Sequence, residues 1–406
     1  MLESKGVKAM PELANELTNR VNSRLNQVGP SGIREFDQRI SAIPGIVKLT
    51  IGEPDLNTPE HVKQAAIASI AENDSHYSAQ KGTLALRQAI SGFLKRSQGL
   101  TYDPDTEIIA TVGATEALTA TTLTMLNPGD KVIVPTPTFA LYFPIITITG
   151  ATPVMVDTSQ DDFVLTPEKL EQTLQAEGDA VKAVLLNYPS NPTGKEYPQD
   201  VITGLATVIA NHGLFVISDE IYSELTYGVD HFSIAKLIPE RTVLINGLSK
   251  SHAMTGYRMG YVVGPKAFIA NVTKMHAFMV TSPSNPAQAA AAEALNNGDQ
   301  DPIEAKAIYQ RRRDFITTAL ADMGVSTVSP EGAFYIFAKI PDQFGTDDVA
   351  FAERLANEAK VGGTPGSAFG AGGEGYIRFS YAASDAALAV AMTRMKDFLT
   401  ATAEVQ

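Results

Sequence analysis

The chain has 406 residues, of which 44% are hydrophobic, so it can bury one large core or two moderate ones. Its 45 acidic residues outnumber its 32 lysines and arginines, and the formal net charge of −13 disfavours nucleic acids and anionic membranes as partners. Cysteine is absent, which excludes disulfides, thiolate catalysis and cysteine-ligated metal sites.

In chain order, the N-terminal stretch of residues 1–17 comes first, and it has no apolar signal core. No later stretch reaches the length of an apolar membrane span, so we expect a cytoplasmic protein without a membrane partner. The middle of the chain then alternates between short apolar runs and amphipathic patterns. These predict a helix over 115–126, strands over 131–139 and 181–189, a helix over 198–213, and strands over 214–222, 242–250 and 260–264.

This alternation predicts an α/β fold with a mostly parallel sheet, in a large domain of residues 56–294. The two ends, residues 1–55 and 295–406, have a different pattern. They combine a long helix with strand-like runs over 333–340 and 376–382 and a second helix near 347–360. We expect the ends to form one smaller α+β domain built from both termini.

Three further patterns suggest no chemistry of their own. None of the six histidines stands at metal-ligand spacing, so no metal site is expected. Residues 370–375, GAGGEG, have the glycine spacing of a dinucleotide-binding loop, but they run into a strand instead of opening a helix, so they predict an ordinary loop. Residues 311–313, RRR, lie in a helical run and predict a solvent-facing surface.

Polar residues follow the predicted strands at the ends where ligands bind in open α/β sheets. Asn191 lies in NYPSNPTG (187–194) after one strand, Asp219 and Tyr222 end another, and Ser249 and Lys250 end a third. Because the carboxyl ends of parallel strands share one edge of a sheet, we expect these side chains to converge on one crevice.

A phosphate cradle is expected at the same edge. Gly113, Ala114 and Thr115 stand between a strand-like run and a helix, where free backbone N–H groups suit a phosphate. Each polar residue taken singly has a structural explanation, such as a surface lysine or a helix cap. A lysine, an aspartate, a tyrosine, an asparagine, an arginine and a phosphate cradle in one crevice together favour a pyridoxal-phosphate site.

The chemistry of that cofactor gives each residue a reason. Lys250 supplies the amine that forms a Schiff base with the cofactor aldehyde, and Asp219 would keep the pyridine nitrogen protonated. Asn191 and Tyr222 can hydrogen-bond the ring oxygen. The remaining cofactor contacts are expected from Arg258, Ser249, the backbone amides of Ala114 and Thr115, and the ring of Phe139.

Seven segments stand in order along nearly the whole chain: TIGEPDLNTPEHV (50–62), SHYSAQKGTLALR (75–87), NYPSNPTG (187–194), SDEIY (218–222), GLSKSHAMTGYRMGY (247–261), PEGAFYIF (330–337) and YIRFSYA (376–382). Together they resemble the fold-type I pyridoxal-phosphate aminotransferases, the aspartate aminotransferase superfamily. The resemblance implies a seven-stranded, mostly parallel sheet between helices and a smaller second domain.

The resemblance also implies roles for single residues. Lys250 would be the Schiff-base lysine and proton shuttle, and Arg378 would grip the substrate α-carboxylate close to Asn191 and the backbone of Gly52. Tyr77 would reach the cofactor phosphate of the partner subunit, which implies a homodimer with shared active sites.

The chain departs from the family pattern at three glycines. Many relatives have a serine that contacts the phosphate where this chain has Gly247. An apolar β-branched pair is common where this chain has Gly362 and Gly363.

The resemblance favours ping-pong transamination from an L-amino acid to a 2-oxo acid such as 2-oxoglutarate. A carbon–sulfur β-lyase is the alternative from another reaction class. The whole-chain pattern is most similar to bacterial aromatic amino acid aminotransferases, and N-acetyl-L,L-diaminopimelate and aspartate aminotransferases are alternatives within the family. Ile33 would form an apolar wall over the substrate side chain, whereas Lys81 would either reach a distal carboxylate from the partner subunit or simply be solvated.

Overall fold

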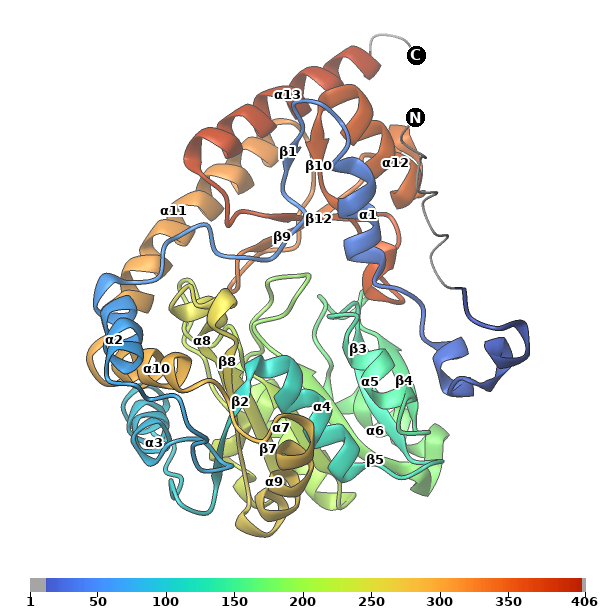
Figure 1. Ribbon diagram of the computed structural model, residues 1–406. Helices are drawn as coiled ribbons and strands as arrows, with labels where there is room; N and C mark the ends of the chain where they lie inside the picture. The colour runs from blue at the N-terminus through green and yellow to red at the C-terminus, as the bar shows by residue number, and fades with distance from the viewer. Residues whose placement is uncertain (1–11, 404–406) are drawn as a thin grey trace, which may run out of the picture.

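The computed structural model describes residues 12–403 and is built on one seven-stranded sheet (Figure 1). The strand order is β2-β8-β7-β6-β5-β3-β4. Strand β8 runs antiparallel to both of its neighbours, and the other pairs are parallel, which confirms the predicted mostly parallel sheet. The strands are β2 (Ile108–Val112), β3 (Lys131–Thr136), β4 (Thr152–Asp157), β5 (Val181–Asn187), β6 (Phe215–Asp219), β7 (Thr242–Gly247) and β8 (Met259–Val263).

Helices cover both faces of this sheet because its strands point apolar side chains to both sides. In β5, Ala183 and Leu185 pack with α4, α5 and α9, while Val184 and Leu186 pack with α6 and α7. A further layer of α2, α3 and α10 packs at the β2 and β8 end. The helices are α2 (Glu60–Ala71), α3 (Leu84–Gln98), α4 (Gly113–Met125), α5 (Tyr142–Thr147), α6 (Pro167–Glu177), α7 (Gln199–Asn211), α9 (Lys266–Val280) and α10 (Asn285–Asn297).

A second group of elements, drawn from both ends of the chain, lies above the sheet in Figure 1. Strands β11 (Thr364–Pro365), β12 (Tyr376–Ser380) and β9 (Tyr335–Lys339) form an antiparallel sheet, and β1 (Val47–Lys48) pairs with β10 (Val361–Gly362). The expected boundaries at residues 55 and 295 stay a prediction, and residues 1–11 and 404–406 lie outside the described part of the chain. The helices of this group are α1 (Gly32–Ile40), α11 (Asp301–Asp322), α12 (Asp348–Arg354), the π-helix Leu355–Ala359 and α13 (Asp385–Ala403).

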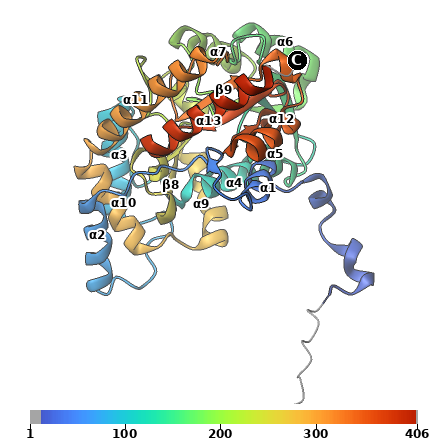
Figure 2. The same ribbon diagram turned by 90° about the horizontal axis from the view of Figure 1, so that it is seen from above.

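Figure 2 shows α11 and α13 side by side across the top of the molecule, and the short 3₁₀ helix Asn15–Arg20 at its periphery. The following 3₁₀ helix, Ser23–Gln27, contacts the end of α5, where Arg24 donates to the Ile148 carbonyl oxygen at 3.2 Å. No helix within residues 12–403 is long and apolar enough to cross a membrane.

Two sequence-based predictions need correction. The strand expected over 242–250 ends at Gly247, and Lys250 lies in the short helix α8 (Leu248–Ser251) that follows. The triplet 311–313 is not simply solvent-facing, because Arg312 is only 8% exposed and pairs with two carboxylates. The loop predicted over 370–375 is confirmed, and positive φ angles at Gly370, Gly372 and Gly375 explain why glycine occupies those positions.

Candidate active site

The carboxyl ends of β5, β6 and β7 and the first turn of α4 surround a cavity of about 690 Å³. Its upper side is closed by residues of α1, β9 and β12. Of the residues predicted from the sequence, Gly113 and Tyr77 do not line it. Those that do are Ile33, Gly52, Ala114, Thr115, Phe139, Asn191, Asp219, Tyr222, Ser249, Lys250, Arg258 and Arg378.

Lys250 points its amine into this cavity from α8. Its Nζ donates a hydrogen bond to the carbonyl oxygen of Gly52 at 2.7 Å and lies 6.0 Å and 5.7 Å from the ring centroids of Tyr222 and Phe334. Burial lowers the pKa of Lys250 to about 8, because a buried ammonium loses its hydration. A larger neutral fraction makes this amine a better nucleophile and base near neutral pH than an exposed lysine.

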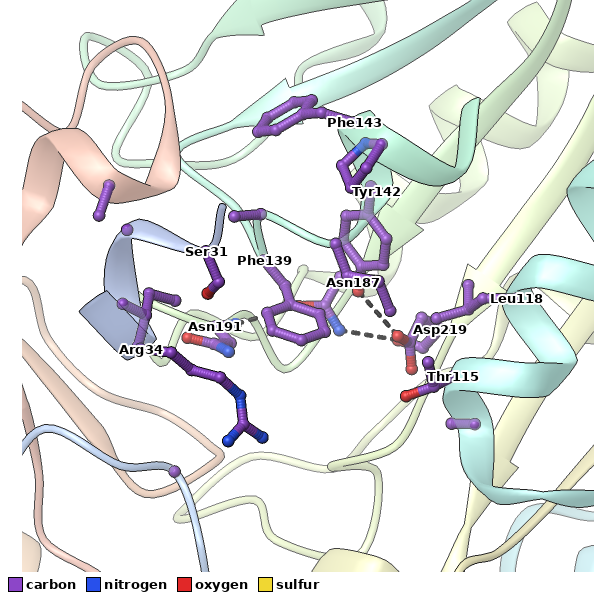
Figure 3. Close-up of a pocket in the computed structure, with 18 of the residues that line it drawn as sticks. Ser31, Arg34, Thr115, Leu118, Phe139, Tyr142, Phe143, Asn187, Asn191 and Asp219 are labelled. Atoms are coloured by element: carbon purple, nitrogen blue, oxygen red, sulfur yellow. Dashed lines mark hydrogen bonds between the residues drawn. The ribbon is translucent and has the colours of Figure 1, made fainter. Parts of the chain in front are cut away.

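Asp219 ends β6 and is fixed by two donors. The hydroxyl of Tyr142 donates to Oδ2 at 2.7 Å, and the backbone N–H of Ile221 donates to Oδ1 at 3.2 Å. The Asn187 amide also donates to the Asp219 carbonyl oxygen at 3.0 Å, and Figure 3 shows these side chains grouped on one wall of the cavity. Burial raises the pKa of Asp219 to about 6, so the carboxyl group is mostly ionised at neutral pH.

Arg378 lies on β12 and is a buried cation without a carboxylate partner among residues 12–403. One guanidinium nitrogen donates to Asn191 Oδ1 at 2.8 Å, another donates to the Thr50 carbonyl oxygen, and its Nε has no partner. The rings of Tyr335 and Phe369 lie 4.5 Å and 4.7 Å from the guanidinium carbon. A buried unpaired guanidinium that lines a cavity suits an anionic ligand group.

Two tyrosines lie between Lys250 and Arg378. The hydroxyls of Tyr222 and Tyr335 are 2.7 Å apart, and burial raises the pKa of each, so both keep their protons. Gly52 is necessary beside them, because a Cβ at that position would lie 1.8 Å from the Tyr335 hydroxyl oxygen.

The opposite end of the cavity is formed by α4 and β8. Gly113 has a φ of 75°, and a Cβ there would lie 2.6 Å from Arg258 Nη2. A Cβ on Gly260 would lie 2.5 Å from the backbone nitrogen of Ala114. These two glycines let a guanidinium and a strand approach the first turn of α4, whose N–H groups have no partner one turn earlier. The result is an anion-binding arrangement.

The glycines that depart from the family pattern have packing explanations. A Cβ on Gly247 would lie 2.8 Å from the Met259 carbonyl oxygen, so a serine there would require the backbone to shift. A Cβ on Gly362 would lie 2.6 Å from Ile40, and one on Gly363 would lie 2.5 Å from Ile377. Large neighbours therefore occupy the space that side chains would need.

Several cavity residues were not identified as site residues from the sequence. Asn187 and Tyr335 lie in two of the segments that carry the family resemblance, and Arg34 directly follows Ile33. Nothing in the local sequence distinguishes Tyr142 from an ordinary core tyrosine. Arg34, on α1, makes no hydrogen bond or ion pair with any residue in the described range. Its guanidinium points toward the open part of the cavity, on the side of Asn191 (Figure 3).

Two residues assigned to the partner subunit's site lie outside this cavity. The Tyr77 side chain is 88% exposed and does not reach the cavity of its own chain. Lys81 donates to the Asp105 carbonyl oxygen at 2.8 Å, so this lysine has a partner within its own chain.

Comparisons with known proteins agree with this geometry. The sequence pattern of aminotransferases of class I and II matches residues 44–395. The chain is 41% identical over 379 residues to a probable N-acetyl-LL-diaminopimelate aminotransferase of Bacillus subtilis, covering 93% of this chain and 95% of that protein. It is 38% identical over 385 residues to aromatic-amino-acid aminotransferase 2 of Thermococcus litoralis, covering 93% and 98%.

Among solved structures, the aspartate aminotransferase from Thermus thermophilus with maleate superimposes with a TM-score of 0.88 at 36% identity, covering 93% of this chain and 99% of that chain. Fold and site together define an enzyme of the fold-type I transferase class, as the sequence predicted. The chain belongs to the class I and II aminotransferase family. It is therefore an aminotransferase.

Proposed function

We propose that this aminotransferase binds pyridoxal 5′-phosphate in the cavity and transfers the amino group of an aromatic L-amino acid to 2-oxoglutarate. The observation that carries the proposal is the buried amine of Lys250, which shares one cavity with the ionised Asp219 and the unpaired Arg378. When bound, the cofactor supplies a conjugated ring that withdraws electrons from the substrate α-carbon.

The residues present fit this cofactor. Gly113 and Gly260 leave the first turn of α4 open beside Arg258, where the phosphate would bind with Ser249 as a further donor. Phe139 turns its ring into the cavity (Figure 3), where it offers a stacking face. The ionised Asp219 would pair with the protonated pyridine nitrogen, and Asn191 and Tyr222 would contact the ring oxygen.

Arg378 and Lys250 would have separate roles, substrate binding and proton transfer. Arg378 would hold the substrate α-carboxylate through its guanidinium group, so that the α-hydrogen has a fixed position. The Lys250 amine would carry that proton between the substrate α-carbon and the bound cofactor. Because the cavity is largely buried, each charge interaction inside it is stronger than in water.

The side-chain region of the cavity has both apolar and cationic groups. Ile33 is 8% exposed and lines the cavity with Leu118 and Phe143, which suits an aromatic ring. Arg34 is the group that would bind the distal carboxylate of 2-oxoglutarate or glutamate. An aromatic donor and a dicarboxylic acceptor could therefore use the same region in turn.

A homodimer is part of the proposal. His276, on α9, hydrogen-bonds the Gln80 carbonyl oxygen at 2.6 Å, which places the loop of Tyr77 beside the end of α9. Phe278, in that helix, is 90% exposed, and Tyr77 is 88% exposed. Exposed aromatic side chains on neighbouring segments are typical of an interface, and Tyr77 would enter the partner's site there.

The visible absorption spectrum of the purified protein tests this function. A band of bound cofactor should fade when L-tyrosine is added and return when 2-oxoglutarate follows. If aspartate or N-acetyl-L,L-diaminopimelate exchanges faster than tyrosine, the aromatic assignment is wrong. Pyruvate and ammonia released from cystathionine without an oxo acid would indicate the β-lyase, and no band even with added cofactor would refute the role of Lys250.

A further inference from the structure

Residues 50–58, TIGEPDLNT, form an extended strap between β1 and α2 that passes over the cavity. No backbone N–H from Ile51 to Thr58 donates to a backbone carbonyl within the described chain. The conformation of the strap therefore depends on side-chain contacts, which are few and can be identified individually.

Leu56 packs against the hydrophobic core, and three polar contacts hold the strap beyond Gly52. The Thr255 hydroxyl donates to Glu53 at 2.6 Å, and the Thr58 hydroxyl donates to the Ala253 carbonyl oxygen at 2.7 Å. The third is the pair between Arg312 and Asp55, and it is the only one of the three that is bidentate and charged at both ends. Bidentate arginine–carboxylate pairs fix geometry more strongly than single hydrogen bonds.

Arg312 lies on α11, and its whole guanidinium group is used in hydrogen bonds to carboxylates. Its Nη1 and Nη2 donate to the two Asp55 oxygens at 2.7 Å and 3.0 Å, and its Nε donates to Asp385 Oδ1 at 2.7 Å. All three guanidinium nitrogens are thus used, and the residue is 8% exposed. The Tyr309 ring centroid lies 5.8 Å from the guanidinium carbon. Arg312 is therefore a buried arginine whose position on the long helix α11 is fixed by hydrogen bonds from all three guanidinium nitrogens.

The strap connects the Arg312–Asp55 pair to the Lys250 amine. Asp55 lies three residues after Gly52, whose carbonyl oxygen accepts the Lys250 hydrogen bond at 2.7 Å. We infer that Arg312 is a positioning residue that, through Asp55 and the strap, holds the Gly52 carbonyl where it orients the Lys250 amine. This inference rests on the proposed role of Lys250 as the proton-moving group.

The start of the strap does not depend on Arg312. The Thr50 carbonyl oxygen, which accepts from Arg378, also accepts from the Thr364 hydroxyl at 3.2 Å, and Arg378 is held separately by Asn191. Loss of the Arg312 contact therefore affects the proton-moving step more than the binding of the substrate carboxylate. A lysine amine displaced by about 1 Å lowers the rate of proton transfer by a large factor without changing affinity.

The test uses Arg312→Gln and Asp55→Asn, with Arg311→Gln as the matched control. Arg311 is the neighbouring arginine, and it also pairs with Asp385 but does not contact Asp55. In the holoenzyme, both test variants should lose roughly 10- to 100-fold in the exchange rate of the substrate α-proton with solvent. The KM for the amino acid should stay within about twofold of wild type in all three variants, and the control should also keep its exchange rate.

A second readout needs neither turnover nor cofactor. In the cofactor-free protein, hydrogen–deuterium exchange of the strap amides should speed up in Arg312→Gln and Asp55→Asn, while α11 stays protected. Combining the two substitutions should add little to either one, because they remove the same contact. This readout still tests whether the Arg312–Asp55 pair holds the strap if the wild type proves not to transaminate.

The possible outcomes distinguish a positioning role of the Arg312–Asp55 pair from a purely structural role. An unchanged α-proton exchange rate, or a KM that rises in parallel with the loss of rate, would overturn the inference, as would strap amides that exchange as slowly as in wild type. Should Arg312→Gln fold poorly, Asp55→Asn still decides the question, because it keeps the size of a side chain that is 26% exposed. Arg312→Lys, which can restore one of the two bonds, should recover part of the rate.

Discussion

The hydroxyl of Tyr142 donates a hydrogen bond to Asp219 Oδ2 at 2.7 Å, from a position 77 residues earlier in the chain. Burial raises the pKa of Tyr142 well above its ordinary value, so the hydroxyl remains a donor at any working pH. A donor of this kind stabilises the ionised carboxylate, which is the form that would pair with a protonated pyridine nitrogen.

Tyr142→Phe should therefore weaken cofactor binding. Removal of a hydrogen bond to a charged group costs about 1.5–3 kcal/mol, or roughly 10- to 100-fold in affinity, and we expect an increase in the cofactor dissociation constant within that range at neutral pH. Absorbance titration of the cofactor-free protein measures it. Tyr102→Phe is the matched control, because the Tyr102 hydroxyl is buried without a partner. Equal affinities for the two variants would contradict the role of Tyr142.

The pH dependence of Lys250 follows from its burial. Burial lowers the pKa of this amine to about 8, so the reactive neutral form increases as the pH rises through that value. Acetylation of Lys250 in the cofactor-free protein, followed by mass spectrometry, should be half-maximal near that pH. The denatured chain should reach half-maximum only near the ordinary lysine value of about 10.4. Identical profiles for the folded and denatured chains would show that burial does not tune this lysine.

The parallel strands were predictable because burial on both faces leaves a continuous apolar run, as in residues 181–187. Sheet topology then predicts that Asp219 and Lys250 lie at one edge of the sheet. Edge strand β4 was missed because its apolar run is short, covering residues 154–156, and its Met155 is 54% exposed.

Contacts between residues distant in sequence could not be predicted in the same way. A run of three arginines predicts a solvent-facing surface. The buried Arg312 instead pairs with Asp55 and Asp385, which lie 257 and 73 residues away in the sequence. The hydrogen bond from Tyr142 to Asp219 likewise joins residues that are distant in sequence. Local pattern thus predicted residues that line the cavity, whereas the contacts that position them depend on the tertiary structure.

Arg378→Lys tests the planar fork expected for carboxylate binding. Lysine keeps the charge but loses the free Nε and the bidentate geometry. We expect kcat/KM for the amino acid to fall roughly 10- to 100-fold, mainly through KM, with cofactor affinity unchanged. Steady-state kinetics measure this. Arg394→Lys, which changes an arginine bonded to the Gly45 carbonyl oxygen outside the cavity, should have wild-type kinetics; a similar loss in both variants would contradict the assignment.

Arg34→Gln tests the proposed sharing of one side-chain region by two substrates. Because Arg34 is exposed, loss of its pairing with a distal carboxylate should raise the KM for 2-oxoglutarate by only about fivefold, corresponding to roughly 1 kcal/mol. The half-reaction with tyrosine should proceed as in wild type. Arg39→Gln, on the same helix but paired with Glu353, serves as the control. A loss confined to tyrosine would place Arg34 against the aromatic ring instead.

Shared active sites make a prediction about mixed dimers. Lys250→Ala removes the amine of one protomer, and Tyr77→Ala removes the hydroxyl proposed to enter the partner's site. In a mixed dimer, the protomer that keeps Lys250 faces the partner that keeps Tyr77, so one complete site is restored. Random pairing of equal amounts produces about one half mixed dimers. Turnover at limiting cofactor should therefore reach roughly one quarter of wild type.

The opposite arrangement predicts a different result from the same mixture. If Tyr77 served the site of its own chain, the mixed dimer would contain no complete site, and co-expression would add nothing to the activity of the separate variants. The exposure of Tyr77 and its absence from the cavity of its own chain argue for the first arrangement. Recovery of turnover on mixing, measured beside size-exclusion profiles of each variant, distinguishes a shared site from two independent ones.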